Sequence, residues 1–156
     1  MDHLSNVEVA IKRMEHLLTV IPAKLYAIHE RDFVAKPAAA AWSKKEILGH
    51  LIDSAANNHQ RFISTQYENV PSLSYDPDKW NALNFYQEAD GKLVIDLWCH
   101  YNQHLLEVSR RIPAERLLNK CLAGGNEPVA LAFLIVDYVE HLEHHLKQIL
   151  EPDAFI

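Results

Sequence analysis

The sequence predicts an all-α protein, and specifically a four-helix bundle. Apolar residues recur at steps of three and four in four long segments, which is the spacing of one face of a helix. Only 4 of the 156 residues are glycine, and no alternation of polar and apolar residues persists as it would in strands. A chain of 156 residues can form one sizeable core, so we expect a single domain spanning residues 1–156.

The first predicted helix spans about residues 5–28. Ser5 and Glu8 indicate its start, because a serine followed three residues later by a glutamate has the spacing of an N-terminal capping box. Pro22 should bend or restart this helix, since proline lacks the backbone donor of a continuing helix. A linker that contains proline and alanine follows at residues 34–41.

The second predicted helix begins within residues 42–46 and continues to about Thr65. Ser43 and Glu46 repeat the capping-box spacing directly before an apolar run. The connection that follows, residues 66–90, is long for a bundle. We expect it either to cover an active site or to cross over and change the order of the helices.

The third predicted helix spans about residues 92–111 and ends before Pro113. A turn at residues 124–126 precedes the fourth helix. Pro128 suits the first turn of that helix, which should extend to about Leu150.

Composition excludes several classes of function. The formal net charge of -6 argues against a nucleic-acid partner. The longest apolar stretch, around residues 128–139, is too short to span a bilayer, so we expect no membrane partner. Cys99 and Cys121 form no disulfide framework, and the N-terminus has no secretory signal. These features predict a cytoplasmic protein.

Helical phase separates the ten histidines into inward-facing and surface groups. His50 lies at the flank of the apolar side of the second helix. His141 and His145 are four residues apart, so they share one stripe at the edge of the core on the fourth helix. The similarly spaced pair His100 and His104 falls opposite the apolar side of the third helix and should lie on the surface.

Three histidines from two helices would form an open metal site if the two polar stripes face each other. Neutral imidazoles suit Zn²⁺, Ni²⁺, Co²⁺ or Fe²⁺ and leave positions for water or substrate. Asp53, Asp137 and Glu143 are candidates to orient the ligands by hydrogen bonds. Arg61 either clamps a substrate carboxylate or forms an ordinary ion pair. A histidine pair at this spacing is also often only the solvated margin of a helix.

With these residues in place, the chain resembles the DinB/YfiT-like superfamily, and within it the bacillithiol S-transferase-like branch. The resemblance rests on WSKKEILGHLIDS at residues 42–54, on YDPDKW at residues 75–80 and on the C-terminal histidine pair. It implies a four-helix bundle with a divalent metal ion held by His50, His141 and His145. It also implies activation of a low-molecular-weight thiol in some relatives, hydrolysis in others, and a frequent homodimer.

The leading hypothesis is therefore a metal-dependent, thiol S-transferase-like enzyme that uses Zn²⁺ or Ni²⁺ and transfers a small-molecule thiol to an electrophile. In this hypothesis Arg61 and Asn57 help to position the substrate. Three alternatives stay open: a hydrolase that uses metal-bound hydroxide, a non-catalytic metal-containing stress-response module, and a metal-free helical interaction protein.

Overall fold

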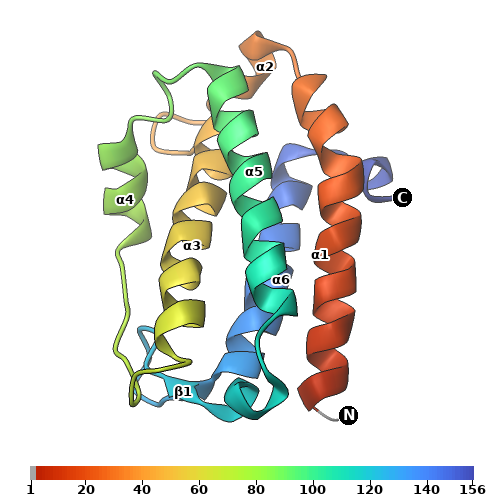
Figure 1. Cartoon of the computed structure of the whole chain (residues 1–156). Coiled ribbons are helices and arrows are strands. Elements are labelled where there is room, and N and C mark those ends of the chain that lie inside the picture. Colours follow the sequence, from red (N-terminus) through yellow and green to blue (C-terminus); the bar gives the residue numbers. More distant parts are fainter. Residues whose placement is uncertain (1–2) are drawn as a thin grey trace.

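The computed structural model describes residues 3–156 and contains the four long helices of a bundle (Figure 1). These are α1 (His3–Tyr26), α3 (Lys44–Ser64), α5 (Gly91–Arg110) and α6 (Leu131–Ile149). The prediction of a four-helix bundle is confirmed. The shorter elements are α2 (Glu30–Val34), α4 (Pro77–Asn84), the 3-10 helices η1 (Ala114–Leu118) and η2 (Pro152–Phe155), and the strands β1 (Lys120–Cys121) and β2 (Val129–Ala130).

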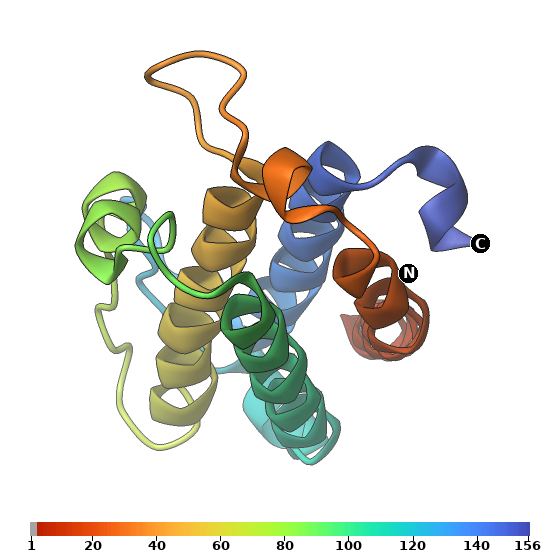
Figure 2. The same cartoon turned by 90° about the horizontal axis from the view of Figure 1, so that it is seen from above.

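The order of the helices around the bundle differs from their order along the chain. Helix α1 packs against α5 and α6, and α3 also packs against α5 and α6. Seen from above, α1 therefore lies diagonally opposite α3, and α5 lies diagonally opposite α6 (Figure 2). Figure 1 shows that the neighbours α3 and α5 run in the same direction. The connection at residues 66–90 is thus a crossover that returns the chain along the bundle, and α4 within it packs against α3.

The start of α3 is fixed by the capping box that the sequence predicts. Glu46 N donates to Ser43 Oγ at 3.1 Å, and Ser43 N donates to Glu46 Oε2 at 2.8 Å. Both backbone donors would otherwise lack a partner at the end of the helix. Because this cap sets where α3 begins, it also sets the direction of His50 in the second turn.

Two details of the sequence-based prediction are wrong, and one of the two alternatives for Pro22 is excluded. Helix α1 already includes Ser5, so Ser5 and Glu8 do not cap it. The same helix continues through Pro22 to its end and does not restart there. Helix α6 begins three residues after Pro128, because the intervening residues of β2 pair with β1 in an antiparallel ladder instead of joining the helix.

A close approach beside α3 brings the end of the crossover onto the bundle. A Cβ atom at Gly49 would lie 2.1 Å from Cδ2 of Tyr86, so only glycine leaves room for that buried ring. Cys99 and Cys121 are buried and free. Within residues 3–156, no helix combines the length and apolarity needed to cross a membrane.

Candidate metal centre

The structure brings His50, His141 and His145 together between α3 and α6. One nitrogen from each ring lies within 4.8 Å of the others. The Nε2 atoms of His50 and His141 are 3.1 Å apart, and the three ring centroids are separated by 5.0, 4.8 and 4.5 Å. Two imidazole ligands at about 2.0–2.1 Å from a tetrahedral ion would place their nitrogens about 3.3 Å apart. The spacing therefore fits a shared metal ion.

Burial keeps two of these imidazoles neutral. It lowers the pKa of His50 to about 4, and the neighbouring His145 acts in the same direction. Burial likewise lowers the pKa of His141 to about 4, with added effects from His145 and His50. A neutral imidazole keeps the lone pair that a metal needs. At pH 7 both rings are thus ready to bind a cation without first losing a proton.

Neutral groups orient two of the rings. Gln148 Oε1 lies 2.9 Å from Nδ1 of His145, and Ser54 Oγ lies 3.5 Å from Nδ1 of His141. A partner on Nδ1 leaves Nε2 as the free nitrogen for a ligand role. Within residues 3–156, Nδ1 of His50 is buried and has no hydrogen-bond partner. The indole of Trp42, at a centroid distance of 5.0 Å, holds that ring by packing instead.

The three carboxylates expected to orient the ligands do not contact them. Asp53 accepts hydrogen bonds from two side chains of the crossover. Glu143 forms an ion pair with Arg13 at 2.7 Å, and Asp137 is exposed. Ser54 comes four residues after His50 and Gln148 three residues after His145, so helical phase held the signal for the groups that take this role.

Arg61 and Asn57 are bonded to other parts of the protein. Arg61 Nε donates to the carbonyl of Leu73 at 3.0 Å, and its guanidinium lies 5.9 Å from the ring centroid of Tyr75. The buried amide of Asn57 donates to the Asp53 carbonyl at 2.9 Å. The first contact fastens the crossover to α3, and the second lies within α3.

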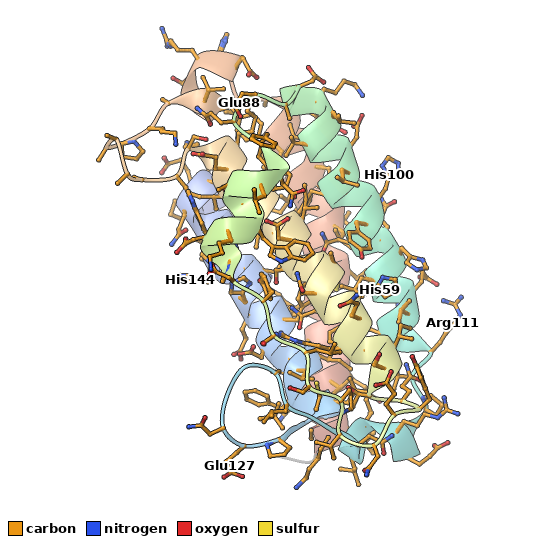
Figure 3. All side chains as sticks on the ribbon, turned by 90° about the vertical axis from the view of Figure 1, so that its left-hand side faces the viewer. His59, Glu88, His100, Arg111, Glu127 and His144 are labelled. Carbon is orange, nitrogen blue, oxygen red and sulfur yellow. The ribbon has the colours of Figure 1, made fainter. Side chains whose placement is uncertain are left out.

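The exposed histidines outside the cluster lie on different sides of the molecule. His100 and His104 are exposed, which confirms their surface assignment. Figure 3 shows His144 on one side of the molecule and His59 and His100 on the other. His144 is exposed, and its ring centroid lies 5.1 Å from that of His145.

The comparisons with known proteins agree with this fold. YfiT from Bacillus subtilis, described as a probable metal-dependent hydrolase with an unusual four-helix bundle topology, is similar with a TM-score of 0.78 and 23% identity over 91% of this chain and 84% of YfiT. A mycothiol-dependent maleylpyruvate isomerase is similar with a TM-score of 0.72 and 10% identity over 94% of this chain and 60% of the isomerase.

A search of curated proteins gives no match. Among protein families, residues 7–149 match the DinB superfamily, a span that includes all three clustered histidines. The four-helix fold and the candidate three-histidine site are both contained in that span. This chain belongs to the DinB superfamily.

Proposed function

We propose that this protein is a metal-dependent enzyme of the thiol S-transferase type, with a divalent ion held by His50, His141 and His145. The observation that carries the proposal is the convergence of three imidazoles from two helices on one point. Two of these rings are neutral at pH 7 because burial lowers their pKa values. A hydrogen bond between His50 and His141 would explain one short distance, but it would not explain why the third ring joins them.

When bound, Zn²⁺ or Ni²⁺ would lower the pKa of a coordinated thiol, so that the thiol reacts as a thiolate near neutral pH. Three protein ligands leave room for such a thiol. Trp42 packs on His50, and the residues of α3 directly before and after His50 are buried. In this proposal Arg61 and Asn57 position the substrate indirectly, since Arg61 holds the crossover in place. The mycothiol dependence of the similar isomerase supports a small-molecule thiol.

Hydrolysis is the second candidate function. The description of YfiT as a probable metal-dependent hydrolase favours it. The same three-histidine arrangement would serve water in place of a thiol. The two functions differ in one requirement, because only the transferase needs a thiol.

Metal analysis tests the ligand set. Purified His50→Ala, His141→Ala and His145→Ala proteins should each lose the stoichiometric metal that the unchanged protein binds. His104→Ala is the matched control, because His104 belongs to a pair with the same four-residue spacing on an exposed helix face. Full metal content in His50→Ala would exclude the proposed triad.

Activity measurements test the reaction. Metal-free and metal-reloaded protein would be incubated with several low-molecular-weight thiols and a chromogenic electrophile. Turnover that needs both metal and thiol supports the transferase, whereas ester cleavage without thiol supports the hydrolase. Absence of metal-dependent turnover with every thiol would reject the transferase.

The resemblance also leads us to propose a homodimer in the cytoplasm. Light scattering of the purified protein measures its oligomeric state. Fractionation of the source cells measures its location.

A further inference from the structure

A hollow of about 410 Å³ lies next to the three histidines. Its lining residues come from the linker before α3 and from α3, α4 and α6: Ala40, Ala41, Trp42, Ile47, Asp78 and Gln148. Two of its walls contact the histidines directly, since Trp42 packs on His50 and Gln148 bonds to His145. The hollow therefore adjoins the triad through Trp42 and Gln148.

The hollow carries one negative charge. Asp78 is the ionisable residue of its lining, and its carboxylate is exposed and forms no ion pair within residues 3–156. Its neighbour Asp76 differs, because that carboxylate caps α4 and pairs with Lys79 at 3.3 Å. Asp78 shares the lining of this hollow with Trp42, the residue that packs on His50.

Positive side chains lie in the adjoining hollow, and none is among the six residues that line the hollow of Asp78. The adjoining hollow includes Lys36, Lys44 and Asp32. Lys36 pairs with Glu46 at 2.9 Å, so its charge is already compensated. The negative charge of Asp78 is thus unopposed within its own hollow.

We propose that this hollow is a subsite for the positively charged amino group of an amine-bearing thiol, which Asp78 and the indole of Trp42 bind together. A carboxylate attracts an ammonium group, and an indole attracts it through its electron-rich face. The volume lies in the range of small-molecule sites. This inference rests on the proposed thiol-dependent function. Because the subsite is open to solvent, we expect about a tenfold preference rather than an absolute one.

The test measures binding and needs no turnover. Protein loaded with Co²⁺ would be titrated with cysteamine, 2-mercaptoethanol and mercaptoacetate, which are small and carry a positive, neutral and negative group. The near-ultraviolet band of cobalt–thiolate coordination reports each affinity. The ratio of cysteamine affinity to mercaptoacetate affinity is then compared between the unchanged protein and its variants. Differences in how strongly each thiol binds cobalt cancel in this comparison.

We expect Asp78→Asn to lower the ratio of cysteamine affinity to mercaptoacetate affinity about tenfold. Asp78→Lys should lower the ratio further, because the new positive charge favours mercaptoacetate. Glu88→Gln is the matched control, because it removes one exposed negative charge outside the hollow and should leave the ratio unchanged. Circular dichroism would show that each variant is folded. An unchanged ratio in both Asp78 variants overturns the subsite alone, whereas the absence of a thiolate band with every thiol overturns the thiol-dependent function as well.

Discussion

Replacing Asp53 with asparagine should stabilise the metal-free protein at pH 8. The Asp53 side chain is 1% exposed. Its Oδ1 atom accepts hydrogen bonds from the Tyr86 hydroxyl at 2.6 Å and from Asn84 Nδ2 at 2.9 Å. Within residues 3–156, its Oδ2 atom has no partner. Burial raises the pKa of Asp53 from 3.8 to about 6, although the two hydrogen bonds act in the opposite direction.

The size and sign of the effect follow from this shift. A carboxyl group whose pKa is raised on folding stabilises the protein below its unfolded pKa and loses that contribution as the pH rises through the folded pKa. The shift from 3.8 to about 6 corresponds to about 3 kcal/mol between pH 4 and pH 7. Asparagine keeps one oxygen for both donors but buries an amide group without a partner, which costs about 1–3 kcal/mol. We therefore expect a net gain of about 1 kcal/mol at pH 8.

Urea unfolding of the two proteins in a chelator, at several pH values from 5 to 8, measures this difference without a contribution from metal binding. The free-energy advantage of Asp53→Asn should increase as the pH rises towards 7 and then become constant. Glu88→Gln serves as the control for a change in net charge, because Glu88 is exposed. If the stability difference between Asp53→Asn and the unchanged protein does not vary between pH 5 and pH 8, then Asp53 does not become an ionised buried carboxylate in this range. That result would contradict the prediction.

Three further substitutions test the frame around the site. Gly49→Ala should lower stability by about 1–3 kcal/mol, because the new Cβ would lie 2.1 Å from the Tyr86 ring; an unchanged melting temperature would contradict this close approach. Ser43→Ala removes the cap of α3 and should cost about 1 kcal/mol in urea unfolding. Arg61→Ala removes the hydrogen bond to Leu73 and should speed proteolysis of the crossover; a changed KM with unchanged proteolysis would instead support direct substrate contact.

Local patterns in the sequence predicted α3 and the three clustered histidines well. Ser43 and Glu46 are only three residues apart, so their hydrogen bonds depend on little besides the local backbone. Phase along one helix likewise separates His141 from an exposed pair such as His100 and His104, because burial follows the 3.6-residue period. The same kind of pattern failed at Ser5, since serine and glutamate also occur inside helices and the spacing alone does not mark a helix start.

Long-range pairing was harder to predict. Two-residue strands have no periodicity to detect, so the ladder between β1 and β2 left no local signal, although it delays the start of α6. The diagonal placement of α1 and α3 depends on how whole helix faces pack, which the order along the chain does not determine. Asp78 shares a hollow with Trp42, which packs on His50, only because the crossover returns α4 along α3.

The carboxylates expected to orient the histidines show the same limit of local sequence patterns. Because these carboxylates do not contact the rings, the histidines are oriented by other groups, and this has a chemical consequence. Buried and half-buried carboxylates attract the strongest donors nearby, and Asp53 and Glu143 meet those donors on other segments. The groups that do reach the rings, Ser54 and Gln148, are neutral and do not pull a proton from imidazole as a carboxylate does. The imidazoles would therefore donate less charge to a bound ion. An ion held in this way would remain a stronger Lewis acid, which favours ionisation of a thiol at neutral pH.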